Sequence, residues 1–140
     1  MNKILTKLLF FLFLLPNILL AKSEFFQEGV NLFNKNKYEK AKFKFEQDIV
    51  FNPKSEMSYL YLSKIFKNLK DKNLQEKNLN TVILLNPKNE EALYYLAKLK
   101  LESSDYQKSK ELNVRLNNIC DKFCNQSKKL KIEIENLSKK

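Results

Sequence analysis

The sequence predicts an all-α protein in which pairs of helices stack side by side as a solenoid. Two observations carry this prediction: the composition of the chain and an internal repeat. The 140 residues include one glycine and three prolines and are rich in Leu, Lys, Asn and Glu, which favours helices. The segment FNPKSEMSYLYLSK at 51–64 returns as LNPKNEEALYYLAK at 85–98, which is 34 residues later.

The N-terminal segment differs from the rest of the chain in its hydrophobicity. It begins with lysines, continues as an apolar run interrupted at Pro16, and ends in small residues, which is the layout of a secretory signal peptide. The apolar run falls short of a comfortable bilayer span. We expect residues 1–21 to be cleaved off, with cleavage after Ser23 as an alternative, and the protein to be exported to the periplasm or cell envelope. An uncleaved anchor and a buried core helix are the alternative interpretations.

Three units align when the 34-residue shift is extended in both directions. Apolar residues recur at helical spacing in the first half of a unit, as Tyr59, Leu62 and Phe66 do, and each of the first two units closes with Asn-Pro. Polar turns are expected at 34–37, 70–73 and 103–105. One aligned position is small in all units: Gly29, Ser63 and Ala97. Because one helical pair cannot bury its own apolar stripe, neighbouring pairs must stack into a superhelical ribbon with an inner and an outer surface.

The unit resembles the tetratricopeptide repeat, a helix-turn-helix unit with a small residue in its first helix and Tyr-x-x-Ala in its second. The matching residues are Phe25, Gly29, Tyr38, Ala41, Phe45 and Pro53, then Tyr59, Leu62, Ser63, Leu79 and Pro87, then Leu96, Ala97 and Tyr106. Lys72 and Gln75 depart from the pattern, and Asp48 stands at a usually small, apolar position. The resemblance implies a domain over 22–140 whose repeats span about 22–55, 56–89 and 90–120.

The last stretch of the chain is predicted to be a capping helix at about 122–138. One helical face is apolar apart from a serine, and the opposite face is mostly Lys, Glu and Asn. That apolar face carries Phe123, Ser127, Leu130, Ile134 and Leu137. A terminal repeat needs such a helix, since no further repeat covers it. A coiled-coil seam is the alternative.

The only two cysteines, Cys120 and Cys124, are predicted to form a disulfide. In the repeat register Cys120 falls at a helix break and Cys124 starts the capping helix, so a bridge across the turn is geometrically reasonable. An exported protein also meets an oxidising compartment. The resemblance adds support, since some exported repeat proteins of this type carry a similar pair. Free thiols and a redox-active dithiol are the alternatives.

The composition argues against catalysis, metal binding and nucleic-acid binding. The chain has no histidine, the commonest general base and metal ligand, and a single glycine cannot build a phosphate loop. The acidic pair Glu90 and Glu91 is explained by the start of a helix. The formal net charge is +10, yet the lysines are spread along the chain and Arg115 is the only arginine. We expect no enzyme, no cofactor, no metal site and no nucleic-acid partner.

The resemblance implies an interaction module whose first helices line an inner groove for an extended peptide or a partner's helix. The groove residues carried over are Phe26, Val30, Phe33, Leu60, Lys64, Lys67, Tyr94, Lys98 and Leu101. The lysines suit a partner with an acidic stretch or a free carboxylate. The carboxylate clamp of chaperone-binding members is not implied, because Phe26 and Val30 stand where that clamp has Lys and Asn.

We therefore expect a non-enzymatic adaptor or assembly factor of the cell envelope that binds another protein. The alternative is a basic protein of the membrane surface, held to anionic lipid by its charge and released by salt. A redox role for the cysteine pair is a third interpretation. The sequence does not indicate an oligomeric state.

Overall fold

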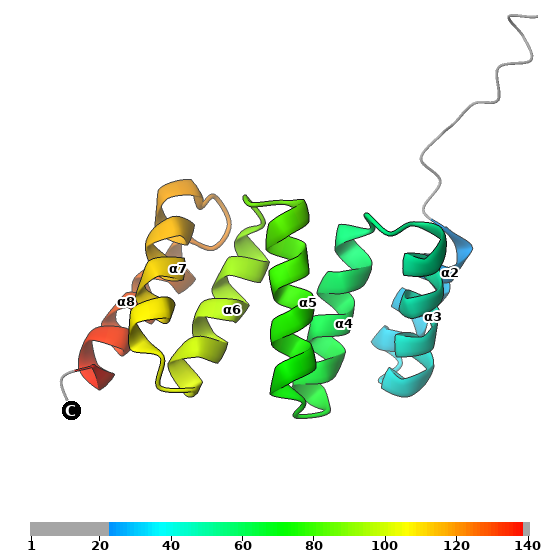
Figure 1. Cartoon of the computed structure of the whole chain (residues 1–140), viewed down its shortest axis with the longest axis horizontal. Coiled ribbons are helices and arrows are strands. Elements are labelled where there is room, and N and C mark those ends of the chain that lie inside the picture. Colours follow the sequence, from blue (N-terminus) through cyan, green and yellow to red (C-terminus); the bar gives the residue numbers. More distant parts are fainter. Residues whose placement is uncertain (1–22, 139–140) are drawn as a thin grey trace, which may run out of the picture.

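The structure, a computed structural model, describes residues 23–138 and shows them as a row of helices (Figure 1). The helices are α2 (Glu24–Asn34), α3 (Tyr38–Phe51), α4 (Glu56–Asn68), α5 (Lys72–Leu85), α6 (Glu90–Glu102), α7 (Tyr106–Ile119) and α8 (Cys124–Leu137). No strand occurs between residues 23 and 138, so the all-α prediction is confirmed there. The predicted signal peptide lies outside the described residues.

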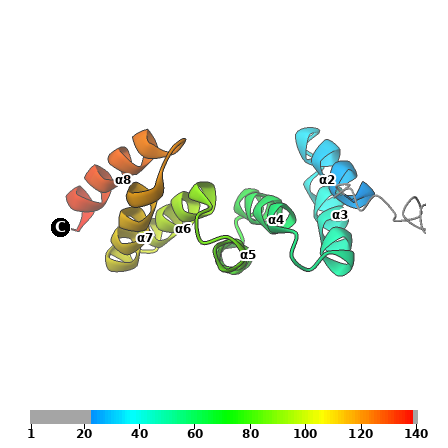
Figure 2. The same cartoon turned by 90° about the horizontal axis from the view of Figure 1, so that it is seen from above.

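The helices form three antiparallel pairs, α2 with α3, α4 with α5, and α6 with α7, and α8 covers the last pair. Figure 2 shows the row from above as two layers, with α2, α4, α6 and α8 in one layer and α3, α5 and α7 in the other. The row curves towards the first layer, so α2 and α8 rise at its two ends. This is the predicted solenoid of three helix-turn-helix repeats with a capping helix.

The two helices of a repeat approach closely at the small position of the repeat register. At Gly29 an added Cβ would lie 2.8 Å from the ring of Phe45, so only glycine fits without displacing that ring. The equivalent Ser63 and Ala97 are buried, and the hydroxyl of Ser109 donates a 2.8 Å hydrogen bond to the carbonyl of Ala97. The small residues therefore set the distance between paired helices, as the sequence predicts.

The turn inside each repeat has the same backbone conformation in all three repeats. Asn36, Lys70 and Ser104, spaced by the repeat length, have φ values of 57°, 60° and 62°. Glycine is the usual residue in this left-handed region because a side chain is unfavourable there. In repeats two and three an aspartate caps the helix that follows the turn. The side chain of Asp71 accepts a 2.9 Å hydrogen bond from the backbone N–H of Leu74, and that of Asp105 accepts one of 3.1 Å from the backbone N–H of Lys108.

The core divides into two clusters of different chemistry. The first, between repeats one and two, is aromatic: Phe26 and Phe45 are buried, and the ring of Tyr61 stacks on that of Phe45 at 4.9 Å. The second, from repeat two to the cap, is mainly aliphatic, with Leu93 and Leu116 fully buried. Each cluster is shared between neighbouring pairs of helices, so no pair completes its core alone.

A buried carboxylate joins the first repeat to the second. Asp48 is 1 % exposed and accepts hydrogen bonds from the hydroxyls of Ser23, Ser55 and Ser58. At the next junction, the positions of Asp48 and Ser58 are taken by Val82 and Ala92, both fully buried. The departure from the repeat pattern at Asp48 is thus matched by hydroxyl donors on the facing helix starts.

The capping helix departs from the repeat register at one position. On α8 the buried Ser127, Leu130 and Ile134 face the preceding pair, as predicted, whereas Leu137 of the predicted face is 36 % exposed. The small position of the repeat register is occupied on α8 by the exposed Lys131. A second helix could not approach α8 there as closely as α5 approaches α4.

Asp48→Val is expected to lower the free energy of unfolding by about 1–3 kcal/mol, because three hydroxyls, one of them on the buried Ser58, lose their acceptor. Adding Ser58→Ala, which copies the pair Val82 and Ala92, should recover part of the loss. The reciprocal Val82→Asp buries a carboxylate without hydroxyl donors and should cost more, about 3–5 kcal/mol. Chemical denaturation measures all three. Equal costs for Asp48→Val and Val82→Asp would show that the serines do not stabilise the carboxylate.

Candidate functional site

The concave face of the solenoid contains a hollow of about 220 Å³ near its middle. Helix α4 contributes polar residues to its lining, and α2 and α6 contribute one aromatic ring each. Its lining residues are Phe33, Ser63, Lys64, Lys67, Asn68, Gln75 and Tyr95. Helices of all three repeats therefore contribute to one site.

Helix α4 supplies most of this lining because its sequence is amphipathic. Lys67 follows Ser63 by four residues and Lys64 by three, so the three side chains line the same hollow from one side of the helix. Ile65 and Phe66 point into the core on another face and are at most 7 % exposed. The arrangement presents two lysines to the groove and anchors the helix beneath them.

The two lysines of the hollow differ in their charge environment. The ammonium of Lys64 forms a 2.8 Å ion pair with Glu91 of α6 and lies 5.1 Å from the ring centre of Tyr61. The ammonium of Lys67 lies 5.0 Å from the ring centre of Tyr95, a favourable cation–π contact, and has no ion pair among residues 23–138. The positive charge that remains unbalanced in the hollow is that of Lys67.

Tyr95 presents a neutral phenol to the groove. Burial raises the pKa of Tyr95 above its ordinary value, and the charge of Glu91 adds to the rise. The nearby Lys64 and Lys98 act in the opposite direction without cancelling it. The phenol stays protonated at neutral pH and keeps its O–H as a hydrogen-bond donor.

The structure separates the nine residues of the predicted groove into three groups. Phe33, Lys64 and Lys67 line the hollow; Val30, Tyr94 and Lys98 are partly buried beyond it; and Phe26, Leu60 and Leu101 are buried in the core. The last group is at most 5 % exposed, so its side chains support the groove from below and present no surface to a ligand. The rings of Tyr94 and Phe123 are in contact, with centres 5.6 Å apart. Partner binding by the accessible residues stays a prediction.

Four residues of the hollow are absent from the predicted groove: Ser63, Asn68, Gln75 and Tyr95. Gln75 was visible in the sequence as a polar residue at the position that holds Ala41 in the first repeat. Tyr95 was visible as the second member of a Tyr-Tyr pair, one position away from the predicted Tyr94. A search of first helices alone misses Gln75, because it comes from the second helix of its repeat.

A recurring glutamate fastens each of the last two helical units to the one before it. Glu56 accepts hydrogen bonds from the side chains of Asn86, at 3.0 Å, and Asn89. Glu90, which follows Glu56 by one repeat, accepts from three successive backbone N–H groups at 121–123, at 2.8–3.0 Å. The sequence interpretation of Glu90 as a favourable charge at a helix start is therefore incomplete, since its carboxylate also holds the turn before the cap.

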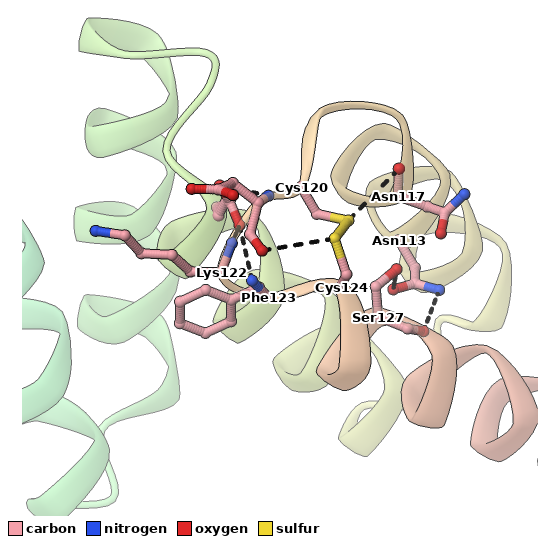
Figure 3. Close-up of a disulfide and its surroundings, with 9 residues drawn as sticks. Asn113, Asn117, Cys120, Lys122, Phe123, Cys124 and Ser127 are labelled. Atoms are coloured by element: carbon pink, nitrogen blue, oxygen red, sulfur yellow. Dashed lines mark hydrogen bonds between the residues drawn. A yellow bond between two sulfur atoms is a disulfide. The ribbon is translucent and has the colours of Figure 1, made fainter.

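The cysteine pair lies in that same turn (Figure 3). Cys120 follows the last residue of α7, Cys124 is the first residue of α8, and their sulfurs are at disulfide distance, 2.13 Å apart. Behind the turn, Asn113 and Ser127 exchange 3.1 Å hydrogen bonds between α7 and α8. Glu90 and the disulfide thus act on one short connection that positions the cap.

Two further properties of the described residues bear on the class of protein. Between residues 23 and 138, no helix is both long and apolar enough to cross a bilayer. Within the same range, no group of three or more His, Cys, Asp or Glu side chains could hold a metal ion.

Solved structures with the same arrangement are tetratricopeptide-repeat domains. The first such domain of Spaghetti (RPAP3), bound to the HSP90 peptide SRMEEVD, superposes with a TM-score of 0.72 at 15 % identity, covering 81 % of this chain and 90 % of that one. The Yersinia enterocolitica type III secretion chaperone SycD, in complex with a peptide of the translocator YopD, gives 0.73 at 15 % identity, covering 84 % and 93 %. The TPR2B domain of yeast Sti1, in a complex with pHsp70, gives 0.75 at 15 % identity, covering 81 % and 95 %.

These likenesses establish the fold: the chain is a tetratricopeptide-repeat solenoid, as the resemblance in the sequence implies. No protein-family model matches the chain, and no curated protein matches its sequence. At 15 % identity the solved structures support the architecture alone. Any argument about function has to be made from the residues of the groove.

Glu90 is expected to make stability depend on acid. Burial raises the pKa of its carboxyl, but the backbone hydrogen bonds from Phe123, Asp121 and Lys122 outweigh this and leave the pKa below its ordinary value of 4.5. The stabilisation is therefore fully present above pH 4.5 and is lost as the pH falls through the lowered pKa.

The measurement compares the unfolding free energy of the wild type and Glu90→Gln across this pH range. The difference should be largest at neutral pH and should shrink on acidification. Glu133→Gln is the matched control, because Glu133 is an exposed residue of α8 that makes no hydrogen bond or ion pair through its side chain among the described residues. A difference that is the same at every pH would contradict this role of Glu90.

The disulfide is expected to contribute about 2 kcal/mol to stability, since it closes a short loop in the unfolded chain. Replacing both cysteines, Cys120→Ser with Cys124→Ser, should lower the free energy of unfolding by that amount and leave groove binding intact. Denaturation of oxidised and reduced protein provides the same comparison without mutation. Loss of partner binding in the serine variant would instead favour a functional role for the pair.

Proposed function

We propose that this protein is a non-enzymatic interaction module, an adaptor or assembly factor, that binds a peptide or helix of a partner protein in its concave groove. The proposal is carried by the hollow, where three repeats converge around an unpaired lysine. A site of about 220 Å³ is smaller than the usual small-molecule pocket, and it opens on a curved face that continues on both sides. These features suit one anchor residue of a longer chain better than a separate metabolite.

The charges and aromatic rings of the groove indicate the chemistry of the partner segment. Lys67 and the partly buried Lys98 favour an acidic segment, and the rings of Phe33 and Tyr95 offer apolar contact to the same segment. The solved neighbours with HSP90, YopD and Hsp70 peptides show that this fold accommodates peptides in other proteins.

The site of action that we propose is the cell envelope, after export. The basis is the N-terminal sequence, with its lysines, short apolar run and small residues before Ser23. The cysteine pair at disulfide distance is consistent with an oxidising compartment. Mass spectrometry of the protein from its own cells decides both points, through the position of the N-terminus and the masses with and without reductant.

A second candidate function is attachment to an anionic lipid surface. It is favoured by the edge of the solenoid that carries the turns between repeats, where Val50 and Leu84 are 74 % and 81 % exposed and one repeat apart. Lysines recur at the same edge with the repeat spacing: Lys54, Lys88 and Lys122, all exposed. Apolar and basic residues together are what a membrane surface attracts.

The triple variant with alanine at Lys64, Lys67 and Lys98 tests the groove. Cross-linked pull-downs from envelopes of the source organism, at low and high salt, should lose about tenfold or more of a salt-resistant partner, since removing charge-assisted contacts costs more than 1.4 kcal/mol. The control replaces three exposed lysines of α3, α5 and α8, namely Lys40, Lys77 and Lys129, and should retain the partner. Equal losses in both variants, together with equal losses in binding to anionic vesicles, would favour the lipid candidate.

A further inference from the structure

Gln75 is a buried polar residue whose side chain is left without a partner. It is 7 % exposed and lines the hollow, and its amide makes no hydrogen bond within residues 23–138. Among the described residues, only Gln47 and Gln126 have a fully buried side-chain oxygen without a hydrogen-bond partner. The amide of Gln75 therefore reaches the open space of the hollow, where it can bond to a ligand.

The equivalent positions in the other repeats have no such unsatisfied group. Ala41 has no polar side chain, and the hydroxyl of Ser109 is bonded to the carbonyl of Ala97 at 2.8 Å. Ser63, which also lines the hollow, is satisfied as well, since its hydroxyl donates to the carbonyl of Leu60 at 2.7 Å. The free hydrogen-bonding groups of the hollow are therefore the amide of the buried Gln75, the exposed amide of Asn68 and the phenol of Tyr95.

The charge balance around the hollow favours the binding of one anion. Lys64 is neutralised by Glu91 at 2.8 Å, whereas Lys67 is held over Tyr95 and has no carboxylate partner among the described residues. One cation and one amide donor on the same small site match the needs of a single carboxylate, which accepts hydrogen bonds and carries one negative charge.

We infer that the hollow between α2, α4, α5 and α6 is an anchoring subsite for one carboxylate side chain, of Asp or Glu, within the partner's bound segment. Lys67 forms the ion pair, and the Gln75 amide donates a hydrogen bond to the same carboxylate. An internal side chain is favoured over a chain terminus, because the concave face continues on both sides of the hollow, so a bound segment can extend past the hollow in both directions. The inference deepens the proposed groove function and rests on it.

The test follows the side-chain amide signals of Gln75 by NMR in the full chain. The probe is glutamate with both backbone ends blocked, N-acetyl-glutamate N-methylamide, so that its only carboxylate is in the side chain. Blocked glutamine is the uncharged control, and N-acetyl-alanine presents a terminal carboxylate instead. We expect a saturable shift of the Gln75 signals with blocked glutamate, and a markedly smaller response to the other two compounds.

Lys67→Gln should weaken the binding of blocked glutamate about tenfold, as loss of one charge-assisted contact implies. Lys72→Gln, on an exposed residue of α5 outside the hollow, is the matched control and should leave the titration unchanged. Gln75→Ala should weaken the probe as well, followed through the backbone signals of Lys67. It places at 75 the residue that Ala41 shows to be accepted at this register, so the variant is expected to fold.

The inference is overturned if blocked glutamine shifts the Gln75 signals as strongly as blocked glutamate, or if none of the probes shifts them. A stronger response to N-acetyl-alanine would overturn the side-chain assignment in favour of a terminal carboxylate. The pull-down with the triple lysine variant distinguishes failure of the carboxylate subsite from failure of the proposed groove function. A partner lost there without a Gln75 response leaves the groove function and removes the subsite. A Gln75 response without any groove-dependent partner supports the subsite as an anion site and removes the groove function.

Discussion

The solenoid depends on the close contact between the two helices of each repeat. At one position per repeat the first helix carries a residue small enough for the second to lie against its backbone, and at Gly29 even a methyl group would meet the ring of Phe45. Close packing there fixes the orientation of each pair, and the orientation of each pair fixes where its apolar face meets the next one. The curvature that makes a concave face, and with it the hollow, follows from the repetition of this contact.

The junctions between repeats are less uniform than the pairs themselves. One junction uses a buried carboxylate with three serines, another uses aliphatic packing, and the glutamates at 56 and 90 bond first to asparagine side chains and then to bare backbone. Each solution satisfies the same requirement, that polar groups at helix ends find partners when neighbouring units cover them. Apolar residues define the stack, and polar residues make each junction specific to its two neighbours.

The fold could be predicted from the sequence because its determinants are local and repeated. The 34-residue period, the small position and the Asn-Pro breaks each act within one unit or between adjacent units. The groove could be predicted only in part. Glu91 decides which lysine keeps a free charge, because it pairs with Lys64. Glu91 belongs to the next repeat, so the sequence around Lys64 does not reveal this ion pair. Phe26, Leu60 and Leu101 were assigned to the groove although they are buried, because a small rotation of a helix moves a residue from its surface to its core.

Lys131 has a consequence for how the array can be extended. A repeat array grows in evolution, or in engineering, by copying a unit and inserting it where the stacking surface is still open. On α8 a long charged side chain stands where the three repeats have a small residue, so a copied repeat placed directly after α8 would meet an ammonium group instead of a close contact. New units are therefore more readily accommodated between the described repeats than directly after α8.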